Sequence, residues 1–242
     1  MIFDPPVIAH RGASAQAPEN TFAAFKKAKA LGLQWVEFDV RLSASGDLVI
    51  FHDDCLERTT NGFGKVIQHP YQYIKTLDAG QWFSYDYKNE RVPTLPDLLV
   101  YLSELGLSAN LEIKSSPGYE ELLTQYVIKI IEKSPKIPML ISSFSREVLT
   151  LVKQTSSPLD VGFLMHRWEE DWEKIFDDIN AQAIHISDNM VTPARVIELK
   201  RKKCPLLVYT IDNPDRANVL FDLGVDAVFS NCPVDFNIAY QK

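Results

Sequence analysis

The sequence predicts an α/β fold in which eight parallel strands close into a TIM (β/α)8 barrel, and three observations lead to this prediction. Short apolar runs rich in β-branched residues alternate with amphipathic stretches along nearly the whole chain, which is typical of βα units around a parallel sheet. The chain has 242 residues, which suits eight such units, whereas a doubly wound sheet usually has fewer strands. No repeat, low-complexity tract or linker divides the sequence, so we expect a single domain over residues 1–242.

The expected elements follow from apolar periodicity and from the residues that favour helix ends. We expect strands at residues 7–10, 35–40, 48–52, 109–114, 139–143, 160–164, 183–187, 206–210 and 226–230. We expect helices at residues 19–31, 95–105, 118–133, 145–155, 168–179, 192–202 and 214–223. Pro193 and Pro214 lie in first helical turns, and Gly32 and Gly224 follow helix ends, as these residue types prefer.

An eight-stranded barrel leaves one expected strand to explain. Residues 41–47, between the second and third strands, are too few for a parallel crossover, so we expect an antiparallel hairpin. The turn of this hairpin would set Glu37 opposite His52. A bulge at Gly46 would instead shift the pairing of the two strands by one residue. Residues 53–93 follow and are too long and apolar for a bare loop. We expect a small insertion beside the active face, with its aromatic side chains packed onto the barrel mouth.

Composition and charge exclude several classes of function. The chain has a formal net charge of -7 and a pI near 5.3, and we expect no nucleic-acid partner because such a protein needs a basic face. Cys55, Cys204 and Cys232 have no CxxC spacing and form neither a disulfide framework nor a zinc set. The N-terminal residues show no signal-peptide pattern, and no stretch approaches the roughly 18 apolar residues of a membrane span. We therefore expect a cytoplasmic protein without stable membrane association, and the oligomeric state stays open.

Three carboxylates occupy strand positions where an ionised side chain is costly. Glu37 and Asp39 are two residues apart in an apolar strand, so both point to one face. Glu112 and Lys114 repeat this spacing on a later strand. A cation would offset the cost, and ligands that are all oxygen favour a hard divalent ion, Mg²⁺ or Ca²⁺. The alternatives are an outward-facing acidic pair and a buried ion pair between Glu112 and Lys114.

Two histidines and an arginine occupy strand ends, where the active sites of barrels lie. His10 and Arg11 follow the first expected strand, and His52 ends the third. An imidazole gives or takes a proton near neutral pH, and a guanidinium presents a planar fork to a phosphate. Two imidazoles beside a metal-bound phosphate would provide the base and the acid of phosphodiester cleavage. The alternative is structural, with His10 capping the strand, Arg11 on the surface and His52 without a chemical role.

Several short motifs occur in the order and spacing of one protein family. They are His10-Arg11-Gly12, Pro18-Glu19-Asn20-Thr21, Glu37-Phe38-Asp39-Val40, Phe51-His52-Asp53, Leu111-Glu112-Ile113-Lys114 and Gly224-Val225-Asp226. Through these motifs nearly the whole chain resembles the bacterial, cytoplasmic type of glycerophosphodiester phosphodiesterase. The resemblance implies a TIM barrel that hydrolyses glycerophosphodiesters, such as glycerophosphocholine and glycerophosphoethanolamine, to sn-glycerol 3-phosphate and an alcohol. Such an enzyme belongs to lipid and glycerol metabolism and acts on small molecules.

The resemblance also implies a role for each motif residue. The implied residues are, for the metal, Glu37, Asp39 and Glu112; for acid/base catalysis, His10 and His52; and for phosphate contacts, Arg11 and Lys114. Which histidine is the base stays open. The nucleophile is also open, because either water or the 2-hydroxyl of the substrate's glycerol, which would give a cyclic phosphate, fits the chemistry.

Two stretches depart from the family pattern. Residues 209–212 read Tyr-Thr-Ile-Asp where members often have Trp-Thr-Val-Asn, so we expect Tyr209 to supply the aromatic surface for glycerol. Residues 230–233 read Ser-Asn-Cys-Pro where members commonly have an acid or a threonine before the proline. Ser142, Ser143 and Phe144 also resemble a family feature and either line the pocket or pack beneath it, and for Phe144 we expect core packing.

Two other functions remain open for this sequence. One is a phospholipase C- or D-like enzyme that acts on lysophospholipid head groups, for which aromatic residues of segment 53–93 would contact lipid. The other is a non-catalytic barrel that binds glycerophosphodiesters. The presence of both histidines and all three carboxylates argues against the second, because a binding module needs no acid/base pair.

Overall fold

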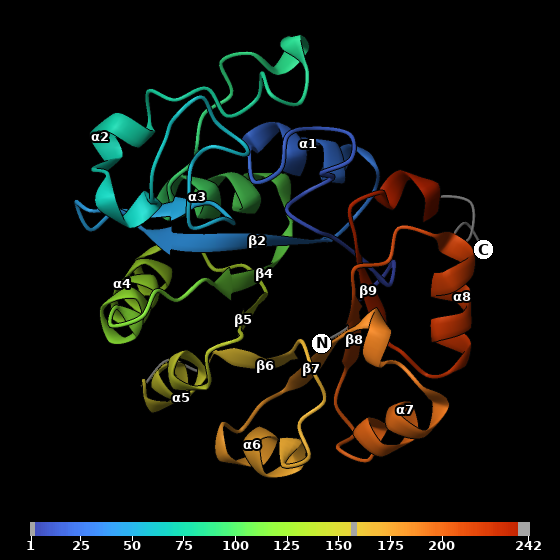
Figure 1. Ribbon diagram of the computed structural model, residues 1–242. Coiled ribbons are helices and arrows are strands. Elements are labelled where there is room, and N and C mark those ends of the chain that lie inside the picture. The colour runs from blue at the N-terminus through green and yellow to red at the C-terminus, as the bar shows by residue number, and fades with distance from the viewer. Residues whose placement is uncertain (1–2, 156–158, 237–242) are drawn as a thin grey trace.

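The predicted barrel is present in the computed structural model, which describes residues 3–155 and 159–236. Eight parallel strands pair side by side, and the pairing of β9 with β1 closes the ring (Figure 1). The ring contains β1 (Val7–Ala9), β2 (Trp35–Leu42), β4 (Ser108–Ile113), β5 (Met139–Ser143), β6 (Asp160–Met165), β7 (Ala183–Ser187), β8 (Leu206–Tyr209) and β9 (Ala227–Ser230). The expected TIM barrel is therefore confirmed.

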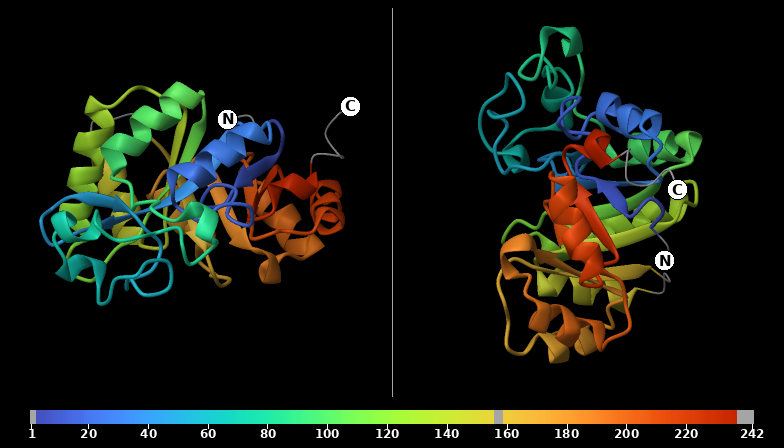
Figure 2. Two further views of the ribbon diagram at one scale, coloured as in Figure 1. Left: turned by 90° about the horizontal axis from the view of Figure 1, so that it is seen from above. Right: turned by 90° about the vertical axis from the view of Figure 1, so that its right-hand side faces the viewer.

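Helices cover the outside of the ring (Figures 1 and 2). They are α1 (Phe22–Ala30), α2 (Tyr71–Ile74), α3 (Leu95–Leu105), α4 (Glu120–Lys133), α5 (Arg146–Gln154), α6 (Trp172–Asp178), α7 (Pro193–Lys200) and α8 (Pro214–Asp222). Short 3-10 turns occur at Val66–Gln68, Tyr85–Tyr87, Asp188–Met190 and Pro233–Phe236. Thr21, Thr94 and Thr192 begin their helices, because each side chain accepts a hydrogen bond from an N–H of the first turn.

No helix in the described part of the chain is both long enough and apolar enough to cross a membrane. The longest, α4, has 14 residues and carries its buried side chains on one face against the barrel. The helices and the outer faces of the strands share one large apolar core. The core thus fixes the strands from outside and leaves their inner faces free for other side chains.

A second apolar cluster, which we call the apolar plug, fills the barrel interior near the amino ends of the strands. It consists of Phe3, Ile8, Trp35, Leu140, Ala183, Leu207, Ala227 and Phe229. Apart from Phe3 and Phe229, each of these residues lies at the first or second position of its strand. Side chains alternate along a strand, so the next inward positions lie nearer the carboxyl ends of the strands. Because the apolar plug occupies the amino ends of the strands, the polar inward-facing residues lie nearer the open, carboxyl end of the barrel.

The ninth strand, β3 (Leu48–Ile50), pairs antiparallel with β2 outside the ring, as the short connection predicts. The register differs from the expected one, because Val40 lies opposite Ile50. The pairing of Glu37 with His52 is therefore wrong by one residue. Gly46 in the turn has a φ of 85°, a left-handed conformation that favours glycine. The shift is the one expected from an extra residue at this glycine.

Residues 53–93 project from the barrel next to α1 and α3 (Figure 2). A small apolar cluster fills the interior of this segment. Its members are Val49 of β3, Phe51 just after β3, and Leu56, Val66, Ile74, Leu77, Ala79 and Val92 of the segment itself. Tyr87 reaches the barrel, because its hydroxyl donates to the Gln16 carbonyl at 2.9 Å. Phe63 and Tyr85 are 74% and 69% exposed. The expectation that the aromatic residues of this segment pack onto the barrel is thus wrong for these two, since aliphatic side chains fill the cluster.

Candidate active site

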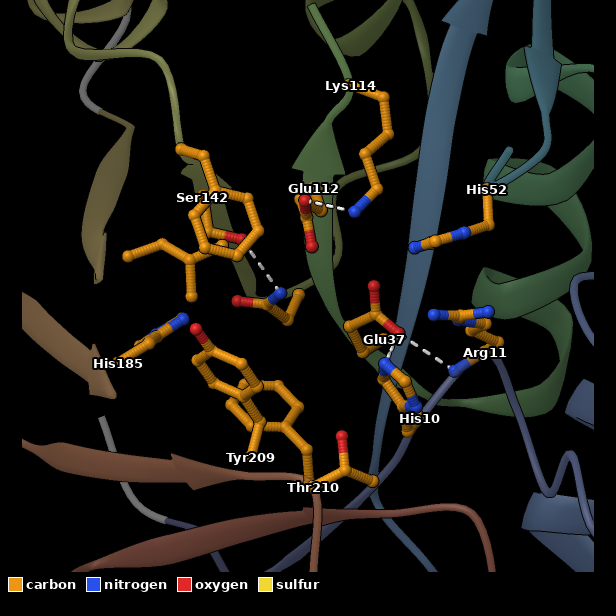
Figure 3. A pocket seen from close by; sticks show the side chains of 14 residues that line it. His10, Arg11, Glu37, His52, Glu112, Lys114, Ser142, His185, Tyr209 and Thr210 are labelled. Atoms are coloured by element: carbon orange, nitrogen blue, oxygen red, sulfur yellow. Dashed lines mark hydrogen bonds and ion pairs between the residues drawn. The ribbon is translucent and has the colours of Figure 1, made fainter. Parts of the chain in front are cut away.

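A cavity of about 250 Å³ opens where the carboxyl ends of the strands meet (Figure 3). It is lined by His10, Arg11, Glu37, His52, Asn110, Glu112, Lys114, Ser142, Phe144, Leu164, His185, Tyr209, Thr210 and Phe229. Of the site residues predicted from the sequence, all but Asp39 line the cavity. Asp39 contacts the lining residues Arg11 and Lys114. The structure therefore brings the predicted residues together, whereas their roles stay predictions.

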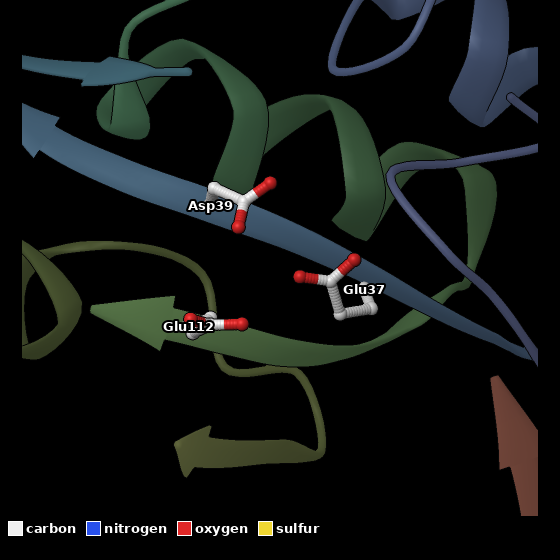
Figure 4. A group of neighbouring side chains, drawn as sticks. All are labelled: Glu37, Asp39 and Glu112. Atoms are coloured by element: carbon white, nitrogen blue, oxygen red, sulfur yellow. The ribbon is translucent and has the colours of Figure 1, made fainter. Parts of the chain in front are cut away.

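The three predicted metal ligands form one cluster (Figure 4). Asp39 on β2 lies opposite Glu112 on β4, and Glu37 is one inward position deeper. One oxygen from each carboxylate lies within 4.8 Å of the others, and all three residues are buried. Oε1 of Glu37 and Oδ1 of Asp39 have no hydrogen-bond partner. Buried carboxylate oxygens without donors fit a hard divalent cation.

The electrostatics of the cluster support the same conclusion. Burial, and then the charges of Asp39 and Glu112, raise the pKa of Glu37 well above its usual value. Burial raises the pKa of Glu112 to about 7, against the lowering effect of Lys114. Burial would also raise the pKa of Asp39, but Lys114 and Arg11 outweigh it and hold that pKa low. The charges of Lys114 and Arg11 thus keep Asp39 ionised, and a further cation would stabilise the ionised forms of Glu37 and Glu112.

Two basic side chains border the carboxylates. The ammonium of Lys114 pairs with Glu112 and lies 3.2 Å from Oδ1 of Asp39. The Arg11 backbone N–H donates to Oε2 of Glu37 at 2.8 Å, and its Nε lies 3.6 Å from Oδ2 of Asp39. Arg11 Nε is buried without a hydrogen-bond partner. These donors remain available for an anion that enters the cavity.

The turn after β1 needs glycine at position 12. Arg11 and Gly12 have φ values of 57° and 78°. A Cβ on Gly12 would lie 2.6 Å from the Cβ of Ala24 in α1, closer than real atoms approach. The His-Arg-Gly motif therefore owes its glycine to close packing against the first helix, which fixes the position of the two side chains before it.

His10 is held by a residue from the far end of the sequence. Its Nδ1 lies 2.7 Å from Oδ1 of Asn231. The amide nitrogen of Asn231 donates to Asp212 at 3.0 Å, which leaves the amide oxygen to accept from the imidazole. Nε2 then carries the lone pair and lies 3.9 Å from Oε2 of Glu37. Burial and the charge of Arg11 lower the pKa of His10 to about 4, so the ring is neutral.

His52 is held by a network that reaches into segment 53–93. Its Nδ1 lies 2.6 Å from Oδ1 of Asp53. Arg58 donates to both oxygens of Asp53, at 2.6 and 3.0 Å, and to both oxygens of Glu19, at 2.7 and 2.8 Å. Glu19 in turn accepts from Arg11 at 2.9 Å. One guanidinium therefore ties the orientation of His52 to that of Arg11. Figure 3 shows His10 and His52 on either side of Arg11.

The opposite side of the cavity contains Ser142, for which lining the pocket is one of the two expected placements, and also Asn110 and His185, which were not predicted. Asn110 donates to Oγ of Ser142 at 3.0 Å, and His185 from β7 is 1% exposed. Asn110 precedes Glu112 by two residues, so its inward position could have been read from the same spacing. His185 lies in an apolar strand, which was the available signal. The role of Asn231 had no local signal, because its partner His10 lies 221 positions away in the sequence. Asp212 contacts His10 only through Asn231, so the sequence did not indicate it either.

Tyr209 and Phe144 lie at the mouth of the cavity. The Tyr209 hydroxyl donates to the carbonyl of Met165 at 2.7 Å. Phe144 is 42% exposed, and its ring contacts Tyr209 and His166. The expectation that Phe144 packs in the core is therefore wrong, because it follows the end of β5 and points to the opening. Tyr209 faces the cavity as predicted, and its role toward glycerol stays a prediction.

Comparison with known proteins decides the family. Residues 10–234 match the family model described as "Glycerophosphoryl diester phosphodiesterase family". This chain belongs to that family. It is therefore a phosphodiesterase, that is, a phosphoric diester hydrolase.

Individual relatives cover almost the whole chain. A glycerophosphodiester phosphodiesterase of Caldanaerobacter subterraneus is 35% identical over 94% of both chains. One from Bacillus subtilis is 32% identical over 93% of this chain and 83% of its own. A solved phosphodiesterase of Oleispira antarctica, in complex with the product sn-glycerol-3-phosphate, is 35% identical with a TM-score of 0.95, over 98% of this chain and 97% of its own. The likeness extends through the barrel and the site.

Proposed function

We propose that this family member hydrolyses glycerophosphodiesters such as glycerophosphocholine and glycerophosphoethanolamine to sn-glycerol 3-phosphate and a free alcohol. The observation that carries the proposal is the meeting of three buried carboxylates, two histidines, one arginine and one lysine at a single cavity. The Oleispira relative, which holds sn-glycerol-3-phosphate, supports the identity of the product. Residues 1–242 act as one catalytic domain, in which segment 53–93 is an insertion.

The phosphate group binds between the carboxylate cluster and the basic side chains. Glu37, Asp39 and Glu112 would hold one divalent cation, Mg²⁺ or Ca²⁺, which supplies positive charge to a phosphate oxygen. Arg11 and Lys114 donate to the remaining oxygens and neutralise charge that develops at phosphorus. The side chains of Arg11 and Lys114 already pair with Asp39, so they are oriented toward the cavity before the substrate arrives.

The two histidines move the protons. The hydrogen bond from His10 to Asn231 leaves Nε2 as an acceptor on a neutral ring, which supports His10 as the base for the nucleophile. His52 then gives a proton to the leaving alcohol, and Asp53 stabilises its charged form. The nucleophile is water, or it is the 2-hydroxyl of the glycerol, which would expel the alcohol and give a cyclic phosphate that water then opens to sn-glycerol 3-phosphate. A diester that lacks this hydroxyl separates the two routes. Full activity on such a diester would exclude the hydroxyl.

A direct assay tests the proposal. Release of sn-glycerol 3-phosphate from both glycerophosphodiesters is measured with EDTA, Mg²⁺ or Ca²⁺, for the wild type and for His10→Gln, His52→Gln and the control His69→Gln. We expect metal-dependent release that falls by about 10²–10⁴-fold in the first two variants. His69 lies outside the cavity against Tyr73, so its variant should keep full activity. Absence of release with every metal would overturn the proposal.

A second candidate is hydrolysis of lysophospholipid head groups. Phe63 and Tyr85 favour it, because both are highly exposed and belong to segment 53–93, which begins directly after the cavity residue His52. Co-sedimentation with phosphatidylcholine liposomes, for the wild type and for Phe63→Ser with Tyr85→Ser, tests this candidate. Binding that the double variant loses would support a lipid substrate. Equal recovery in the supernatant for both proteins would leave the soluble diesters as the substrates.

A further inference from the structure

The cavity has a polar floor that the proposed reaction does not use. We define the polar floor as Asn110, Ser142 and His185, which come from β4, β5 and β7 and are 2%, 0% and 1% exposed. Asn110 lies opposite Glu37 in the sheet, one pair deeper than Asp39 and Glu112. The polar floor therefore lies level with Glu37, the deepest of the three carboxylates, and borders the apolar plug of the barrel.

The polar floor has hydrogen-bonding capacity without partners. The Asn110 amide nitrogen donates to Ser142, but its carbonyl oxygen has no donor. Both ring nitrogens of His185 are buried without a partner. A buried polar group without a partner costs free energy, and folded proteins contain few of them. Unpartnered groups that face a cavity therefore indicate a ligand or water that completes them.

The barrel is shaped to hold His185 in this position. A Cβ on Gly162 of β6 would lie 2.7 Å from Nε2 of His185, so only glycine leaves room for the ring. Phe229 packs on the ring from another side, with centroids 5.2 Å apart. Figure 3 shows His185 pointing from its strand toward Ser142 and the middle of the cavity. The position of the ring is thus set by two neighbouring strands.

The chemistry of the polar floor matches hydroxyl groups. It offers an amide oxygen, a serine hydroxyl and an imidazole, and none of these side chains is charged, because burial lowers the pKa of His185 to about 3. A hydroxyl both donates and accepts, so it complements such a mixed set. A phosphate or an ammonium group would instead need opposite charges, which the carboxylate side of the cavity supplies.

We propose that the polar floor binds the hydroxyl groups of the glycerol moiety, which points into the barrel while the second substituent of the phosphate points to the mouth. This inference rests on the proposed function, because it places one end of that substrate. Phe144 at the exposed mouth then contacts the alcohol substituent. The polar floor thus distinguishes a polyol from an alkyl chain on the inner side of the phosphate.

Binding of two matched ligands tests the inference. Calorimetry in Mg²⁺ gives the Kd of sn-glycerol 3-phosphate and of n-propyl phosphate, which has the same carbon chain without hydroxyls. We expect the wild type to prefer glycerol 3-phosphate by about tenfold or more, and His185→Phe and Asn110→Ala each to lose roughly fivefold of that preference. Affinity for propyl phosphate should stay within about twofold, because the phosphate contacts remain.

Ser142→Ala and Ser143→Ala form the control pair. The two serines are neighbours on β5, but the Ser143 hydroxyl donates to the carbonyl of Ile113 and does not line the cavity. Ser142→Ala should weaken the preference and Ser143→Ala should not, which guards against effects of folding alone. An unchanged preference in all variants of the polar floor, with glycerophosphodiester hydrolysis intact in the wild type, would overturn this inference and leave the proposed function standing. A wild type without hydrolysis and without binding of either ligand would overturn both.

Discussion

The two halves of the cavity differ sharply in charge. The half built on β1 to β4 carries His10, Arg11, Glu37, Asp39, His52, Glu112 and Lys114. The half built on β5 to β8 carries Ser142, Phe144, Leu164, His185 and Tyr209, which are uncharged or held neutral. The comparison teaches that the charged side chains of the cavity gather on one side of the ring, while Asn110 on β4 joins the uncharged side through its hydrogen bond to Ser142. Substitutions in the first half should therefore change turnover, and those in the second should change substrate selection.

The largest effect is expected in the charged half. Glu37→Gln removes one carboxylate charge from the cluster while keeping its size, so we expect turnover to fall by about 10²–10³-fold and affinity for Mg²⁺ to drop. Calorimetric Mg²⁺ titration and the glycerol 3-phosphate assay measure the two effects. Glu57→Gln is the control, because Glu57 is fully exposed and accepts only from Gly64 in segment 53–93. Wild-type turnover in Glu37→Gln would show that the cluster is not the metal site.

Two glycine substitutions compare the halves directly. Gly12→Ala should cost about 1–3 kcal/mol of folding free energy and most of the activity, because φ is 78° and the new methyl meets α1. Gly162→Ala should move only the His185 ring, and so raise KM for glycerophosphodiesters with little change in kcat. Urea unfolding and steady-state kinetics measure both variants. The reverse pattern, with kcat lost in Gly162→Ala, would break the division between the halves.

The hydrogen bonds of Arg58 to Asp53 and Glu19 should matter more for activity than for the free energy of unfolding. Arg58→Gln removes the link between Asp53 and Glu19, and we expect kcat to fall by about tenfold because His52 and Arg11 lose their common support. The side chain is 44% exposed, so the loss of folding free energy should stay below about 1 kcal/mol. Arg91→Gln, from an arginine 43% exposed in the same segment, is the control and should keep its kcat. An unaltered kcat in Arg58→Gln would separate segment 53–93 from catalysis.

The neutral half should also give a pH dependence of the free energy of unfolding. His185 has a pKa of about 3 in the folded chain and 6.5 as the reference value, so below pH 6.5 the unfolded chain binds a proton that the folded chain excludes. Its contribution to stability is therefore complete above that pH and declines as the pH falls toward 3. Between pH 8 and pH 5, urea unfolding should lose about 2 kcal/mol more in the wild type than in His185→Phe. Parallel pH curves for the two proteins would contradict a neutral, buried His185.

The charged half was predictable from the sequence for a physical reason. Ionised side chains inside an apolar strand are costly, so the spacing of Glu37 and Asp39 stands out against their surroundings. The barrel was predictable because its period of strand and helix repeats along the chain. The alternation that placed Glu112 and Lys114 on one face also holds in the structure, where both line the cavity.

The rest could not be derived from local pattern. The unpartnered state of the Asn110 amide oxygen and of both His185 ring nitrogens arises only when the ring closes. The hairpin register depended on a single glycine turn, and Phe144 reached the opening because β5 ends just before it. Three matters stay predictions. They are the single domain, the role of segment 53–93 and the roles of the two histidines in catalysis, because the positions of atoms alone do not test how the protein acts.

The contact between His10 and Asn231 has a consequence for how the enzyme comes into being. The two residues are 221 positions apart, and they meet only because β9 docks beside β1. A growing chain therefore holds its three clustered carboxylates, Arg11 and Lys114 long before the His10 imidazole is oriented. The chain can become active only when β9, the last strand, pairs with β1. During synthesis or refolding, the appearance of turnover should therefore report the moment at which the ring closes.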